Sequence, residues 1–167
     1  DAGYPLSGLT VAPFAIQNLF RTKWMPTYGE TLASLYIGHD GARIDIYSRG
    51  SLILTRDIKT GMNSMVESLV EGYTDRRRPS TRDLRWSGAA ATDFTITPTQ
   101  AHKLIMSLDP DAPALGPDDA GHDLSEEDIF DMIRPALDRL VRQVERTFAN
   151  LGGEKVSRVY ISGVVNA

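Results

Sequence analysis

Glycine-bearing turns are the feature of this sequence that could do chemistry. They adjoin apolar, β-branched runs, and their residues are Gly38, His39, Asp40 and Gly41 in the first turn, Gly61 in the second and Gly163 in the third. Glycine lets the backbone approach a ligand closely, and the backbone N–H groups of such a turn can bind phosphate. These six residues are therefore the candidate nucleotide-binding positions, although each glycine alone predicts only a turn.

Several other catalytic and phosphate-binding patterns are missing from the sequence. It has no G-x-S-x-G elbow, and no supporting motif surrounds its histidines, His39, His102 and His122. This argues against a serine-hydrolase triad. Neither G-x-G-x-x-G nor G-x-x-x-x-G-K-[ST] occurs, which excludes Rossmann and P-loop cradles as sequence predictions. The acidic segment 109–123 lacks the ligand spacing of an EF-hand, so we predict no metal site. We also predict no catalytic residue.

Length and composition predict one ordinary domain or two small subdomains. The chain has 167 residues, 41% of them hydrophobic, with no cysteine and a net charge of -4. The lack of cysteine excludes disulfides and fits a reducing compartment, so we expect a cytoplasmic protein. The net charge gives no reason to bind nucleic acid, and we expect the basic run at 76–78 to be a solvated loop. No run approaches the roughly 20 apolar residues of a membrane span, so we expect membrane association only through a partner.

The strongest structural prediction is a β meander formed by residues 32–37, 43–47 and 52–58. These runs are rich in β-branched and large apolar residues, and turns at 38–41 and 48–50 separate them. A short strand at 8–11 and a helix opened by Pro13 should precede the meander. A helix should follow it from Met62 to Val70, with Gly72 as its stop.

The second half of the chain should be mainly helical. We expect a loop at 76–92 with short strands near 84–86 and 94–96, a helix from Thr97 (N-cap) to about Leu108, and a mobile loop at 109–123. Ser125 and Asp128 form a candidate capping box ahead of an apolar stripe from 129 to 151. Within it, Pro135 should kink the helix or mark its first turn. A double glycine at 152–153 should end it, and a buried strand is expected at 156–162.

The order of these motifs resembles the second lobe of actin-like ATPases, most closely the pilus-assembly members of the PilM type. The matching segments are 8–11 ahead of a helix, 36–42 at the second phosphate motif, 56–61 leading into a helix, 97–102 at the adenosine-contacting helix, and 159–163 at the adenosine strand and turn. The resemblance implies an α/β, RNase H-like mixed sheet with helices on both faces. It places residues 1–72 and 124–167 in the core subdomain and residues 73–123 in a smaller insertion. Because the chain starts without methionine and stops after a strand-like run, we expect a piece of a larger protein.

The departures from the family pattern concern its nucleotide contacts. Tyr36 stands where active members carry an acidic residue that organises magnesium and the attacking water. His102 and Ile105 replace the Glu and Lys of the adenosine helix. Two valines, 164 and 165, follow Gly163, and Met62 replaces the second glycine of the other turn. These changes imply that no cofactor is bound or that Mg-ATP binding is weak, and that the six glycine-turn residues are a vestigial cleft.

The resemblance implies a scaffold for a type IV pilus or type II secretion machine that recruits the cytoplasmic tail of an inner-membrane assembly protein and is able to form homo-oligomers. An alternative is a working ATPase whose first phosphate loop and catalytic acid lie upstream of Asp1. A further alternative is an α/β domain unrelated to actin.

Overall fold

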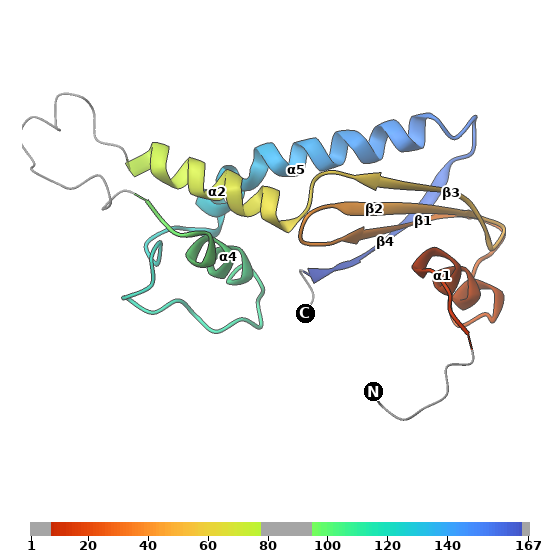
Figure 1. The fold of residues 1–167 in the computed structure, drawn as a ribbon, viewed down its shortest axis with the longest axis horizontal. Coiled ribbons are helices and arrows are strands. Elements are labelled where there is room, and N and C mark those ends of the chain that lie inside the picture. Colours follow the sequence, from red (N-terminus) through yellow and green to blue (C-terminus); the bar gives the residue numbers. More distant parts are fainter. Residues whose placement is uncertain (1–7, 78–94, 165–167) are drawn as a thin grey trace, which may run out of the picture. The chain divides into compact units, whose positions relative to one another are not determined.

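The computed structural model describes residues 8–77 and 95–164 (Figure 1). It contains two compact units, Asp1–Ile58 with Val144–Ala167, and Lys59–Gln143. The expected insertion was 73–123, whereas the second unit of the structure begins at Lys59 and ends at Gln143. Each unit is described separately.

The first unit is built on a four-stranded sheet with the order β3-β2-β1-β4. β1 (Thr31–Ile37), β2 (Ala42–Ser48) and β3 (Ser51–Ile58) form an antiparallel meander, and β4 (Val156–Gly163) pairs with β1 in parallel. The predicted meander is confirmed to within one residue at each strand end. The sheet is therefore mixed, as the predicted α/β fold class requires.

α1 (Ala12–Arg21) covers one face of this sheet. Its Phe20 packs with Leu32 and Tyr47, whose side chains are buried. The strand predicted at 8–11 is wrong, because Val11 is the N-cap of α1 and Leu9 is 92% exposed with no strand beside it. A run of β-forming residues without a neighbouring strand has nothing to pair with.

The opposite face of the sheet carries Ala33, Ile44 and Ile46, all fully buried. Arg56 of β3 lies on this face in register with Ile44, and its Nη1 donates a 3.1 Å hydrogen bond to Oγ1 of Thr147, near the end of α5 (Glu126–Ala149). Helical residues therefore contact both faces of the sheet.

β4 differs from its prediction in burial. The strand forms where expected, but Val159 is 40% and Ile161 is 63% exposed. β4 is the last strand of the sheet, so it has a neighbour on one side only. Apolar composition predicted a buried strand, and edge position explains why it is exposed.

The second unit consists of α2 (Met62–Arg77), α4 (Pro98–Met106) and the first part of α5. Its buried apolar residues are Met62, Met65, Val66, Leu69, Tyr73, Ile96, Ala101, Leu104, Ile105, Ile129, Met132, Ile133, Ala136 and Leu140. α2 does not stop at Gly72 as predicted. It runs to Arg77, so residues 76 and 77 of the predicted solvated loop are helical. A Cβ at Gly72 would lie 2.9 Å from Cγ of Met132, so this glycine allows α2 and α5 to approach closely.

Both helix caps predicted in this unit are confirmed. Thr97 and Gln100 form a capping box at α4, and at α5 the backbone N–H groups and side chains of Ser125 and Asp128 bond reciprocally at 3.0 and 3.2 Å. α5 is one helix beginning at Glu126, so Pro135 lies inside it and does not mark its first turn. It ends at Ala149, before the double glycine, whose two residues have positive φ.

The remaining predictions of the second half lie partly outside the described residues. The strand near 84–86 falls there, residues 95–96 form no strand, and 109–123 is a series of turns. Among the residues that are described, no helix is both long and apolar enough to cross a membrane.

Candidate functional site

The parallel pairing of β1 and β4 brings two of the three predicted glycine turns together. Ile37 at the end of β1 is the register partner of Gly163 at the end of β4. The 38–41 turn follows Ile37 directly, so both turns lie at one edge of the sheet. Gly61 belongs to the second unit, where its carbonyl accepts a 3.2 Å hydrogen bond from the N–H of Ser64 in the first turn of α2.

Two of these glycines are required by backbone packing. A Cβ at Gly163 would lie 2.0 Å from the carbonyl oxygen of Ile37, and Gly163 has φ +146. A Cβ at Gly41 would lie 2.7 Å from the carbonyl oxygen of Ile58. Real Cβ atoms do not approach backbone oxygen so closely, so only glycine fits without a backbone shift. The glycines thus shape the edge of the sheet whether or not a ligand binds there.

The 38–41 turn is closed by a hydrogen bond between its own backbone groups. The N–H of Gly38 donates to the carbonyl of Gly41 at 2.8 Å and so is committed within the turn. His39 and Asp40 are both exposed at its tip. The turn therefore presents two polar side chains to solvent but not the Gly38 N–H group.

Tyr36 occupies the position next to this turn. It pairs with Arg43 across β1 and β2, and its side chain is 42% exposed. Its ring atom Cε1 would be 3.3 Å from a Cβ at Gly38, so the ring lies against the turn. A phenol hydroxyl at this place does not supply the carboxylate oxygen that Mg²⁺ prefers as a ligand.

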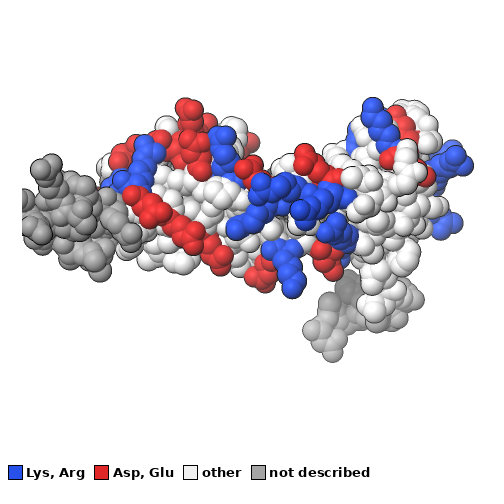
Figure 2. Space-filling model, turned by 90° about the horizontal axis from the view of Figure 1, so that it is seen from above, with Lys and Arg blue, Asp and Glu red and all other residues white. Residues whose placement is uncertain are grey.

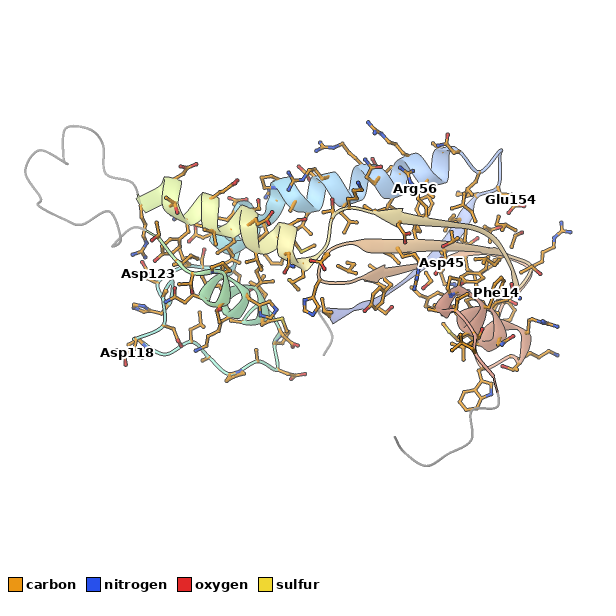
Figure 3. All side chains as sticks on the ribbon, viewed as in Figure 1. Phe14, Asp45, Arg56, Asp118, Asp123 and Glu154 are labelled. Atoms are coloured by element: carbon orange, nitrogen blue, oxygen red, sulfur yellow. The ribbon has the colours of Figure 1, made fainter. Side chains whose placement is uncertain are left out.

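A polar group on β2 was not predicted from the sequence. Asp45, labelled in Figure 3, is 1% exposed, accepts a 2.5 Å hydrogen bond from the hydroxyl of Thr55, and has Oδ2 3.6 Å from Nε of Arg43. That Nε is buried and has no hydrogen-bond partner among the described residues. The alternation of polar Arg43 and Asp45 with Ile44 and Ile46 was the available signal, because alternate strand residues share a face.

Tyr47 continues this polar row toward α1. Its hydroxyl donates a 2.9 Å hydrogen bond to the carbonyl of Pro13. Burial, and after it the nearby Asp45 carboxylate, raise the pKa of the Tyr47 hydroxyl above its ordinary value. The hydroxyl therefore stays protonated and serves as a donor that fastens α1 to the sheet.

A hollow lies within the second unit, between α2 and α5. Its volume is about 450 Å³, and it is lined by Glu67, Ser68, Glu71, Gly72, Asp75, Arg76, Asp128, Asp131, Met132, Pro135 and Arg139. Figure 2 shows acidic side chains interspersed with basic ones over this part of the molecule. The Arg76 guanidinium, bonded to Asp128 at 2.5 Å, together with the Ser125 cap, lowers the pKa of Asp128 to about 2. Across the described residues no three His, Cys, Asp or Glu side chains are placed to hold a metal ion.

The fold is similar to that of solved actin-like proteins. The PilM-PilN type IV pilus biogenesis complex matches with a TM-score of 0.60 and 14% identity, covering 96% of this chain and 36% of that chain. An archaeal actin homolog, Ta0583, matches with a TM-score of 0.57 and 14% identity over 92% of this chain and 42% of that one. MreB5 of Spiroplasma citri bound to ADP matches with a TM-score of 0.57 and 13% identity, covering 81% and 42%.

These matches show that the chain has an actin-like fold. The alternative of an α/β domain without this topology is contradicted by the mixed sheet. The chain spans only about two fifths of the length of these proteins, 36% and 42% in the first two. No protein-family model matches the sequence, and no curated protein sequence matches it.

Proposed function

We propose that this chain is a non-catalytic, actin-like scaffold domain of a bacterial type IV pilus or type II secretion assembly. It recruits the cytoplasmic tail of an inner-membrane assembly protein and lies at the cytoplasmic side of that membrane through this partner. The observation that carries the loss of catalysis is Tyr36 beside the 38–41 turn. A pilus complex among the similar structures supports the choice of machine, since PilM is there in complex with PilN.

The loss of nucleotide binding is supported by the state of the turn itself. The Gly38 N–H group is bonded within the turn, and Val164, directly after Gly163, adds an apolar side chain where the resembling family has small residues. The glycines at 41 and 163 remain because the backbone packing of the sheet edge needs them.

Thermal unfolding with and without nucleotide tests this part of the proposal. We expect no rise in Tm with millimolar Mg-ATP, and magnesium pyrophosphate at equal ionic strength is the control. A ligand present at a thousandfold excess over Kd stabilises the folded state by about 4 kcal/mol, which raises Tm by several degrees. A rise of that size with ATP alone would overturn the proposed loss of nucleotide binding.

Partner recruitment is tested separately by calorimetric titration. The ligands are synthetic peptides of the cytoplasmic tails of the inner-membrane assembly proteins from the same organism, and a scrambled peptide is the control. We expect one tail to bind with a Kd of about 1 µM, which corresponds to a binding free energy of roughly -8 kcal/mol. If no tail binds above the scrambled control, the scaffold function is wrong.

A functional ATPase remains the second candidate. It is favoured by the meeting of the 38–41 turn and Gly163 at one edge, and by solved neighbours bound to ADP or AMPPNP. It requires a first phosphate loop and a catalytic acid in a longer protein. ATP hydrolysis by that longer protein, lost in Asp40→Ala and retained in Asp118→Ala, would establish it.

A further inference from the structure

We propose that α1 and the segments on either side of it dock on an anionic membrane surface. The apolar residues of this region that face solvent define what we call the α1 surface: Leu9 at 92% exposed, Val11 at 57%, Phe14 at 50%, Leu19 at 39%, Trp24 at 83% and Tyr28 at 76%. Six large apolar side chains within 20 residues of sequence are more than the scattered exposure of an ordinary surface.

The charge of this segment is opposite to that of the whole chain. No Asp or Glu occurs between residues 2 and 29, and the only charged side chains there are Arg21 and Lys23. The entire chain carries a net charge of -4. An acid-free, basic and aromatic surface on an acidic protein is complementary to the phosphate headgroups of an anionic bilayer.

The inner side of α1 is fixed to the sheet, which leaves its outer side available. Phe20 stacks edge-to-face on Tyr47 at 5.0 Å between ring centroids, and the Tyr47 hydroxyl bonds to Pro13. The side-chain oxygen of Gln17 accepts a 2.7 Å hydrogen bond from the backbone N–H of Leu52. Phe14 and Leu19 therefore protrude from a helix that is already held in place (Figure 3 labels Phe14).

The loop after α1 is also held against the sheet, and it leaves Trp24 exposed. The backbone N–H of Met25 donates a 3.2 Å hydrogen bond to the carbonyl of Leu19, and the Met25 side chain packs with the Phe20 and Tyr47 cluster. Lys23 has φ 61, which reverses the chain between helix and loop. Because Met25 points inward, its neighbour Trp24 is left in solvent.

Exposed aromatic residues next to basic ones favour a lipid surface over other occupants. Trp and Tyr concentrate at membrane–water interfaces, where their amphipathic rings sit among the headgroups, while Phe and Leu enter the acyl boundary. Arg21 and Lys23, beside Trp24, would meet lipid phosphates at the same depth. This contact acts in addition to the proposed protein partner, and it does not depend on the scaffold function.

Vesicle flotation of the 167-residue chain tests the proposal directly. The vesicles are phosphatidylglycerol with phosphatidylethanolamine, compared with pure phosphatidylcholine. We expect flotation with the anionic vesicles only, and its loss in high salt because surface charge interactions are screened. In a Trp86→Phe background, Trp24 is the sole tryptophan. Its emission should shift to shorter wavelength on binding.

Matched variants locate the contact. Trp24→Ala and Phe14→Ser should each weaken the partition to anionic vesicles by about tenfold, and so should the double change Arg21→Gln with Lys23→Gln. Controls of equal chemistry are Phe130→Ser, 47% exposed on α5, and Arg139→Gln with Arg142→Gln on the same helix. These controls should bind as the wild type does, and circular dichroism should show that every variant folds.

Three results would overturn the proposal. The first is no flotation of the wild type with anionic vesicles, and the second is an equal loss in the α5 controls. The third is a wild-type dimer, measured by light scattering, that becomes monomeric in Trp24→Ala while flotation is unchanged, because the α1 surface would then be an interface between copies. None of these outcomes bears on tail binding or on the ATP result.

Discussion

At the scale of single residues, Gly41 and Gly163 show how a pattern typical of a ligand site can have a packing cause. Both were predicted as phosphate-binding positions. The structure brings both to one sheet edge, and there each faces a carbonyl oxygen that a side chain would strike. The sequence predicted turns at these glycines, whereas the structural reason for glycine depends on which strands pair.

Gly163→Ala and Gly41→Ala should each lower the free energy of unfolding. Overpacking against backbone that cannot rotate away costs about 1–3 kcal/mol, and the positive φ of Gly163 adds to it. Urea denaturation measures the loss. Gly8→Ala is the matched control, because a Cβ at Gly8 meets nothing within 4 Å. If Gly163→Ala is as stable as Gly8→Ala, the β1–β4 register is wrong, and if Gly41→Ala is, the close approach of Gly41 to Ile58 is wrong.

At the scale of elements, Gly72 separates helix propensity from helix packing. Replacing glycine by alanine inside a helix ordinarily stabilises by about 1 kcal/mol. Here the new Cβ would meet Cβ and Cγ of Met132 at 3.0 and 2.9 Å. We expect Gly72→Ala to be net destabilising by about 1 kcal/mol, because overpacking outweighs the propensity gain.

A double-mutant cycle checks this explanation. In a Met132→Gly background both the Cβ and the Cγ of residue 132 are absent, so the same Gly72→Ala change should become stabilising by about 1 kcal/mol. Thermal or urea unfolding of the four proteins gives the coupling. If Gly72→Ala stabilises the wild-type chain as well, then the two helices do not approach as closely as described.

The start of α5 should depend on pH through Asp128. Its pKa is lowered to about 2 by Arg76 first and by the Ser125 cap, compared with 3.8 ordinarily. A carboxylate with a depressed folded-state pKa contributes stability that is complete above its unfolded value and is lost as pH falls through the folded value. We expect this contribution to vanish between about pH 4 and pH 2.

Acid unfolding of Asp128→Asn measures that contribution. The difference in stability between wild type and variant should be present at pH 6 and shrink across the acid range. Asp131→Asn is the control, since Asp131 pairs with Arg134 on the surface but caps no helix. A difference that stays constant from pH 6 to pH 2 would show that Asp128 does not act through its charge.

At the scale of the whole molecule, the open edge of the sheet should govern solubility. β4 is an edge strand that exposes Val159 and Ile161, and an exposed apolar edge invites pairing between chains. We expect Ile161→Lys to reduce concentration-dependent aggregation with a change in stability within about 0.5 kcal/mol. Light scattering at increasing concentration measures it, with Phe130→Lys on α5 as control. If Ile161→Lys leaves aggregation unchanged, the β4 edge is not the cause of aggregation.

The sequence by itself determined the local elements. Strand composition and turn glycines predicted the meander, Thr97 and Ser125 predicted two helix starts, and the long apolar stripe predicted α5. These depend on interactions between residues close in the chain, which composition and spacing report directly. The order of the motifs also predicted the actin-like fold that the solved structures now show.

Tertiary structure alone decided what the elements do to each other. It made Gly72 a point of contact between α2 and α5 and not the end of a helix. It also left residues 8–11 without a neighbouring strand and placed β4 at the edge of the sheet. It buried Asp45 beside Arg43 and turned the outer side of α1 to solvent. At the candidate site, residues 37 and 163 meet only through strand pairing. Contacts between residues far apart in the chain depend on which faces of the sheet and helices pack together, and a single sequence does not show this.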